Sequence, residues 1–129
     1  YEIETNLNSL VPLNELLLPE DERTRLGSEI LIKNGKITKK LDHCVTSENL
    51  ESEYFFHIKN KAKEYGILVS TENNPFPLNY FQIYTPNLNS IAIEPMSSCA
   101  DVFNNPNSIP TCLQPKQSLL FFVKIVLTN

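Results

Sequence analysis

Glycine is scarce in this sequence. Only three of the 129 residues are glycine, at positions 27, 35 and 66, so there is no glycine-rich loop that could cradle a phosphate. Long apolar runs are absent as well, since the longest, Leu119–Val123, falls far short of the roughly 20 residues that a membrane helix needs. We therefore expect neither a nucleotide cofactor nor a membrane partner, and we predict that the protein uses no cofactor.

Basic residues and cysteines are also few. The chain has 11 Lys and Arg against 15 Asp and Glu, a net charge of −4, and nothing in it forms the basic face that nucleic acid requires. The three cysteines, Cys44, Cys99 and Cys112, are odd in number and lack metal-ligand spacing. Cys99 and Cys112 could pair, but free thiols in a reducing compartment are the simpler interpretation. We expect no metal site and a cytoplasmic location.

Many short apolar or alternating segments are present, separated by turns rich in Asn and Pro. They predict an all-β protein built as one antiparallel β-sandwich, and no long amphipathic helix competes with them. The segments expected to be strands are Tyr1–Thr5, Glu29–Lys33, Lys36–Lys40, Tyr54–Ile58, Tyr65–Thr71, Tyr80–Thr85, Ile91–Glu94 and Ser118–Leu127.

Four local patterns carry more specific expectations. Asn34-Gly35 predicts a tight hairpin turn, because both residues tolerate positive φ. The charged run Glu20–Arg25 predicts a solvated loop. Pro95 lacks a backbone N–H and is expected to stop the strand before it. The almost continuously apolar Ser118–Leu127 predicts a strand buried on both faces.

Glu94 is the candidate catalytic residue. It follows Ile91, Ala92 and Ile93, so a buried strand would deliver one carboxylate to the end of a sheet. A carboxylate partly shielded by such apolar neighbours can act as a general base near neutral pH. The simpler alternative is a charged strand end that faces water.

Gln82 and Asp42 are candidate binding residues. Alternation in Tyr80–Thr85 places Gln82 on one face with Tyr80 and Tyr84, where the aromatic rings could stack on a sugar while the amide binds its hydroxyls. A half-exposed strand with ordinary polar pairing explains the same pattern. Taken alone, Asp42 fits a strand end, and the next residue, His43, fits a packed histidine better than a ligand.

Four motifs together resemble the aldose 1-epimerase (galactose mutarotase) family. Ile91-Ala-Ile-Glu-Pro-Met96, followed by Ala100-Asp-Val-Phe-Asn104, is similar to the segment that carries the family's catalytic base. Leu41-Asp-His43, Phe81-Gln-Ile-Tyr-Thr-Pro86 and Leu113-Gln-Pro-Lys-Gln117 resemble three further motifs, in the family's order. The resemblance covers roughly residues 7 to 127.

The resemblance implies a fold, a reaction and a set of site residues. Residues 1–129 would be the C-terminal part of a galactose-mutarotase-like supersandwich, with the N-terminal half absent. Glu94 would be the base that interconverts the α and β anomers of a hexose such as glucose or galactose, and Asp42 and Gln82 would bind the sugar. The family's acid is a histidine of the absent half, which His43 and His57 do not match. We therefore expect this isomerase chain alone to be almost inactive, and to self-associate through its uncovered apolar surface.

Three other functions remain open. A non-catalytic carbohydrate-binding β-sandwich would keep the sugar-contacting strands without the acid. A purely structural sandwich would need Glu94 to point away from any cavity. Asp42 and Glu94 could also form the carboxylate pair of a glycosidase, which depends on their separation.

Overall fold

The protein is all-β in its computed structural model. The structure describes residues 2–20, 24–25, 32–33, 36–37, 40–47, 53–72, 78–105 and 112–129, and these ranges contain no α-helix. The strands are β1 (Glu2–Thr5), β2 (Ser9–Val11), β3 (Thr24–Arg25), β4 (Ile32–Lys33), β5 (Lys36–Ile37), β6 (Asp42–Thr46), β7 (Glu53–Asn60), β8 (Tyr65–Glu72), β9 (Tyr80–Tyr84), β10 (Ala92–Met96) and β11 (Lys124–Thr128).

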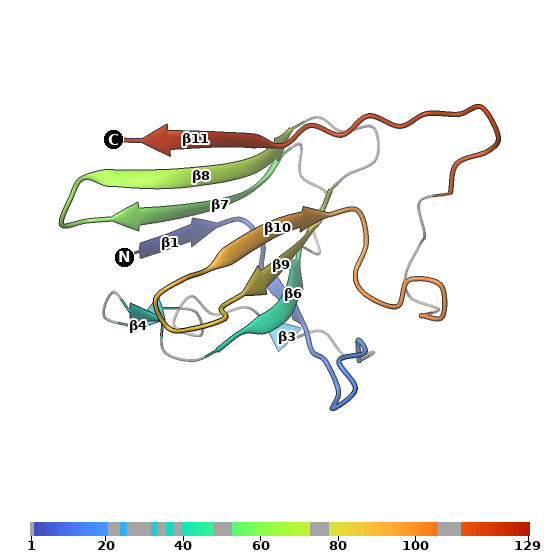
Figure 1. The fold of residues 1–129 in the computed structure, drawn as a ribbon, viewed down its shortest axis with the longest axis horizontal. Helices are drawn as coiled ribbons and strands as arrows, with labels where there is room; N and C mark the ends of the chain where they lie inside the picture. The colour runs from blue at the N-terminus through green and yellow to red at the C-terminus, as the bar shows by residue number, and fades with distance from the viewer. Residues whose placement is uncertain are drawn as a thin grey trace.

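Two antiparallel sheets make up the sandwich (Figure 1). The four-stranded sheet has the order β1-β7-β8-β11, and the five-stranded sheet has the order β10-β9-β6-β2-β3. The short strands β4 and β5 pair only with each other. The all-β sandwich predicted from the turn-separated segments is therefore confirmed.

The β7–β8 hairpin is the longest local pairing, and it runs from Glu53 opposite Glu72 to Asn60 opposite Tyr65. The alternation of β7 explains its position in the sandwich, since Tyr54 and Phe56 are 2% and 0% exposed while their neighbours are half-buried. Aromatic residues favour strands because they pack well on a pleated surface. Both strands agree with the segments Tyr54–Ile58 and Tyr65–Thr71 expected from the sequence.

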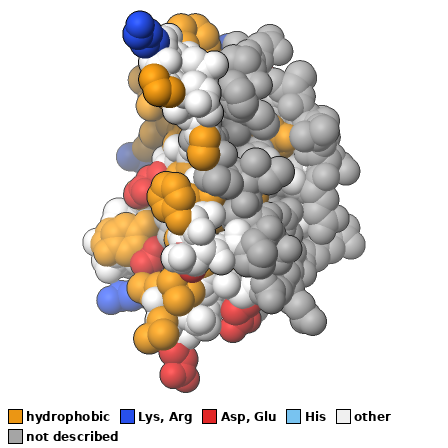
Figure 2. All heavy atoms as spheres, turned by 90° about the vertical axis from the view of Figure 1, so that its right-hand side faces the viewer, with side chains coloured by type: hydrophobic (Ala, Val, Ile, Leu, Met, Phe, Trp, Pro, Cys, Tyr) orange, Lys and Arg blue, Asp and Glu red, His pale blue; other side chains and the backbone are white. Residues whose placement is uncertain are grey.

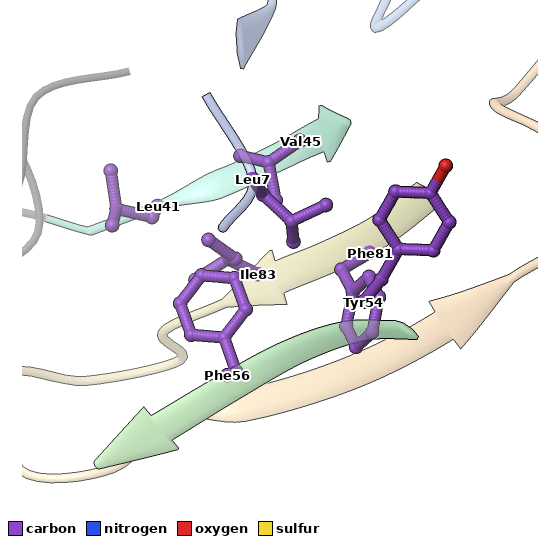
Figure 3. Close-up of a cluster of buried hydrophobic side chains, with 7 residues drawn as sticks. All are labelled: Leu7, Leu41, Val45, Tyr54, Phe56, Phe81 and Ile83. Atoms are coloured by element: carbon purple, nitrogen blue, oxygen red, sulfur yellow. The ribbon is translucent and has the colours of Figure 1, made fainter. Parts of the chain in front are cut away.

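Side chains from both sheets form one core between them (Figure 3). Tyr54 and Phe56 of β7 point from the four-stranded sheet toward Phe81 and Ile83 of β9 and Val45 of β6. The rings of Phe56 and Phe81 are tilted at 42°, with their centroids 6.0 Å apart. Burial of these side chains is the main force that holds the two sheets together, at about 1.5–3 kcal/mol for each fully buried large apolar side chain.

Pro95 does not stop its strand, and that expectation was wrong. It lies inside β10, opposite Phe81 of β9. The reason is that β10 is an edge strand of the five-stranded sheet, and a proline without an N–H is tolerated where one side of the strand has no neighbour.

The closing segment also differs from its prediction. Within Ser118–Leu127, strand pairing begins only at Lys124, and β11 is an edge strand whose residues are mostly exposed. The apolar run predicted burial on both faces, but an edge strand is buried only where other elements cover it, and here they do not.

Two expectations fall partly outside the described residues. The strands on either side of Asn34-Gly35 pair as a hairpin, with Lys33 opposite Lys36, although the turn residues themselves are not described. Of the run Glu20–Arg25, Thr24–Arg25 pairs with β2, so the end of the run is a strand rather than a loop. Charge did not prevent this pairing, because antiparallel strands pair through their backbone N–H and C=O groups.

Candidate functional site

The candidate residues lie on the outer face of the five-stranded sheet. In β9, Phe81 and Ile83 point into the core, so Gln82 between them points outward. Glu94 of β10 is directly opposite Gln82. On the other side of β9, Asp42 of β6 is opposite Tyr84, one pleat away from Gln82 on the same face.

A hydrogen bond already joins two of these side chains. Gln82 Nε2 donates to Asp42 Oδ1 at 2.5 Å. Directly opposite residues of an antiparallel pair have Cβ atoms about 5 Å apart, so Glu94 stands beside the same amide. We call Asp42, Gln82 and Glu94 the polar stripe. The structure brings all three together, while their roles as base and binding residues remain predictions.

Glu94 is exposed, so the shielding by apolar neighbours expected from the sequence is not present. The apolar residues before Glu94 belong to the opposite face of the sheet, where Ile91 and Ile93 pack against the core. Because side chains alternate along a strand, Glu94 faces away from them.

A buried threonine fixes the position of Asp42. The backbone N–H of Leu41 donates to Thr85 Oγ1 at 2.5 Å, and the backbone N–H of Thr85 donates to the Leu41 carbonyl at 2.8 Å. Thr85 is 1% exposed, so water does not compete for these bonds. These two hydrogen bonds join the start of β6 to the end of β9 at Leu41, the residue before Asp42. Sequence reasoning missed this role of Thr85, because only the register shows that it meets Leu41.

A hollow of about 380 Å³ lies at the Asp42 end of the polar stripe. Its lining includes Leu13, Leu17, Lys40, Asp42, His43 and Tyr84. Such a volume lies within the range that small-molecule sites occupy. No sequence pattern indicated Lys40, Leu13 or Leu17 as neighbours of Asp42, because only the fold brings these residues together.

The loop that carries Leu13 and Leu17 is held by Asn14. Its Oδ1 accepts hydrogen bonds from the backbone N–H groups of Leu16 and Leu18, at 2.9 and 3.1 Å. Leu17 has a positive φ of 60°, a conformation that costs a residue with a side chain roughly 1–2 kcal/mol. The Asn14 bonds offset that cost and keep the wall of the hollow in place.

An apolar cluster borders the polar stripe on the side away from the hollow. It consists of Val11, Cys44 and Cys99, with Tyr80 and Met96 packed against them. Cys99 follows β10 and brings the chain over this part of the sheet. None of the three cysteines forms a disulfide, and Cys112 is exposed.

The two histidines occupy different places. His43 lines the hollow, and its Nδ1 accepts a hydrogen bond from the backbone N–H of Asp42 at 3.1 Å. His57 lies on the outer face of the other sheet, where its Nε2 is 2.7 Å from Thr128 Oγ1 and its Nδ1 is 3.6 Å from Glu4 Oε2. Only His43 is near the polar stripe.

The comparisons with known proteins give no family. No family model, no curated protein and no solved structure matches this chain. Among the described residues, no group of three or more His, Cys, Asp or Glu side chains is arranged to hold a metal ion. The described part of the chain also has no helix that is long and apolar enough to cross a bilayer.

Proposed function

We propose that the polar stripe binds one aldose ring and that the protein takes part in aldose 1-epimerase-type mutarotation, with Glu94 as the base. The observation that carries the proposal is the convergence of Asp42, Gln82 and Glu94 on one face, beside a hollow of suitable size. The resemblance of their sequence motifs to the aldose 1-epimerases supports the same reaction.

The reaction needs a base and an acid. Glu94 takes the proton of the anomeric hydroxyl while an acid protonates the ring oxygen, so the ring C–O bond breaks and the free aldehyde forms. The aldehyde rotates and the ring closes on its other face, with the acid and base roles reversed. Each positioned proton transfer contributes roughly 10²–10⁴-fold to the rate.

Asp42 and Gln82 orient the sugar in this proposal. The bond between Gln82 Nε2 and Asp42 Oδ1 holds both groups in place before a ligand arrives. Pre-organised groups lose less conformational entropy on binding. The exposed ring of Tyr84 beside them offers a face on which the C–H surface of a sugar can stack.

Charge favours a neutral sugar. Asp42 and Glu94 place two carboxylates on the stripe, and these accept hydrogen bonds from hydroxyl groups but repel a phosphate. Among the described residues that line the hollow, Lys40 is the only lysine or arginine. We therefore propose a neutral hexose such as glucose or galactose in preference to its phosphate ester.

A second candidate is a carbohydrate-binding β-sandwich without catalysis. It is favoured by the exposure of Glu94, which leaves the carboxylate in water, and by the position of His57 on the other sheet. In this case the polar stripe binds sugar and His43 has no part in proton transfer.

Polarimetry of freshly dissolved α-galactose or α-glucose tests the proposal. Because no matching acid histidine is present, we expect a weak acceleration over buffer that Glu94→Gln reduces to the buffer rate. Glu64→Gln, in the exposed turn between β7 and β8, is the matched control and should keep the acceleration. Sugar binding without any acceleration that depends on Glu94 would favour the second candidate, and no binding at all would contradict both.

A further inference from the structure

The edges of the two sheets are protected unequally. An exposed strand edge offers unpaired backbone groups to other chains, and proteins protect such edges with proline, charge or short length. Here β10 contains Pro95, β1 carries Glu2 and Glu4, and β3 is only two residues long. By contrast β11 has five residues, Lys-Ile-Val-Leu-Thr, with a single charge at its start.

The inner face of β11 is apolar and uncovered. Ile125 and Leu127 are opposite Val69 and Ile67 of β8, on the side of the sheet that carries the core residue Phe56. Yet Ile125 is 71% exposed, Leu127 79% and Ile67 43%. The five-stranded sheet therefore covers β7 but leaves the β8–β11 side of this face open. We call Ile67, Ile125 and Leu127 the apolar shelf.

The segment before β11 extends this apolar surface. Leu120, Phe122 and Val123 are all at least 46% exposed and lead directly into Lys124. Figure 2, which views the molecule from the side on which residues 112–123 run, shows hydrophobic side chains at the surface among polar ones. Large exposed apolar patches mark interaction sites, so we expect this part of the chain to contact another molecule.

We propose that β11 pairs with β11 of a second copy of this chain, antiparallel across a two-fold axis at Val126. In this register Ile125 is opposite Leu127 of the partner, and Lys124 is opposite Thr128 of the partner. The strand is therefore complementary to itself, because apolar residues meet on the inner face and no two charges stand opposite each other. The two four-stranded sheets become one continuous sheet, and the two apolar shelves adjoin on the same face.

A second copy fits better than an unrelated strand for a geometric reason. A two-fold axis perpendicular to the sheet places the inner faces of both copies on the same side, so the apolar shelf of each copy adjoins the apolar shelf of the other. The pairing lies on the four-stranded sheet, whereas the polar stripe lies on the other, so this inference is independent of the proposed function.

Light scattering over a range of concentrations of the 129-residue chain tests the pairing. We expect a concentration-dependent dimer, and we expect Leu127→Lys to weaken it roughly tenfold or more, since a buried leucine is replaced by a charge. Leu88→Lys, at an exposed leucine between β9 and β10, is the matched control and should leave the dimer unchanged. A monomer at every concentration, or a dimer that survives Leu127→Lys, would overturn the proposal.

Cysteine cross-linking tests the register itself. In a Cys112→Ser background, which removes the exposed thiol, Val126→Cys should form a disulfide-linked dimer on mild oxidation. Opposite residues are about 4.5–5.5 Å apart between Cα atoms, which suits a disulfide. Ile125→Cys in the same background should not cross-link, because the two copies of residue 125 would be about 7–8 Å apart on a diagonal. Cross-linking of Ile125→Cys in place of Val126→Cys would contradict the register.

Discussion

His57 Nε2 on β7 lies 2.7 Å from Thr128 Oγ1 on β11, although β8 runs between the two strands. The contact is possible because the residue of β8 beneath it is Gly66, which is opposite Thr128 and has no side chain. On its other side, His57 Nδ1 approaches Glu4 of β1 at 3.6 Å. One half-buried imidazole thus connects both edge strands of the four-stranded sheet.

Removing the hydroxyl should loosen β11. We expect Thr128→Val, which keeps the shape of the side chain, to lower the free energy of unfolding by about 1 kcal/mol, the usual net value of one hydrogen bond. Urea unfolding of Thr128→Val, His57→Asn and the double variant measures the coupling between the two side chains. Additive effects of the two substitutions would show that the contact contributes nothing.

Adding one methyl group at Gly66 should cost more. A Cβ there would lie 2.7 Å from Thr128 Oγ1, 2.8 Å from the Ile58 carbonyl oxygen and 2.9 Å from His57 Nε2. We expect Gly66→Ala to destabilise the protein by about 1–3 kcal/mol, as overpacking does. Thermal unfolding of Gly66→Ala in a Thr128→Ala background gives the control. The double variant should stay destabilised, because the Ile58 carbonyl belongs to the backbone and cannot rotate away.

Acid should weaken the contact between β1 and β7. The hydrogen bond from Lys59 Nζ, 2.7 Å from Glu4 Oε1, holds the pKa of Glu4 below its ordinary value, and the charge of Lys59 and the nearby His57 act in the same direction. Since the folded pKa is the lower one, this stabilisation is present above pH 4.5 and is lost as the pH falls through the folded value.

The pH dependence can be measured by urea unfolding from neutral pH down to about pH 3. We expect Lys59→Met to flatten the acid limb of the profile, because it removes the main cause of the shift. Lys61→Met is a suitable comparison, because Lys61 Nζ, in the turn that follows β7, is 3.0 Å from Glu2 Oε1 of β1. The stabilisation by the Lys59–Glu4 pair should diminish with added salt, because both side chains are exposed. An unchanged acid limb in Lys59→Met would show that Glu4 makes no contribution to the pH dependence.

Asp42→Ala should weaken sugar binding without unfolding the protein. Its carboxylate is exposed and accepts the hydrogen bond of Gln82, so its loss removes a charged acceptor from the polar stripe. A hydrogen bond to a charged group is worth about 1.5–3 kcal/mol, which corresponds to roughly a 10- to 100-fold higher Kd for galactose. Calorimetric titration measures it, and Glu53→Ala on β7 provides a control carboxylate in the other sheet. If Asp42→Ala binds galactose as tightly as the unmodified protein does, Asp42 is not part of the binding site.

The sequence predicted those elements whose burial depends on their own pattern. The alternation of Tyr54 and Phe56 with more polar neighbours is enough to define β7, and the return strand β8 follows after a short polar turn. The alternation of Phe81, Gln82 and Ile83 likewise predicted correctly which side chains of β9 face the core and which face outward.

Patterns that depend on distant neighbours were not predictable in the same way. A proline ends a central strand but is tolerated in an edge strand. The sequence around Pro95 does not show whether its strand is central or at an edge. The apolar run before Leu127 has the composition of a buried strand, while its burial depends on whether another sheet covers it. The meeting of Asp42 with Gln82 required the register of β6 on β9, in which Cys44 rather than Asp42 is directly opposite Gln82.

The β7–β8 hairpin has a consequence for the rate of folding. Its strands are joined by four residues, 61–64, so they can pair within about 1–10 μs, as isolated hairpins do. Its two flanking strands come from near opposite ends of the chain, since β1 begins at Glu2 and β11 at Lys124. Docking them requires the closure of long loops, which places all-β proteins of this kind in the millisecond-to-second range. The four-stranded sheet should therefore form from its centre outward, and β11 should still be exchanging its amide hydrogens when β7 and β8 are already protected.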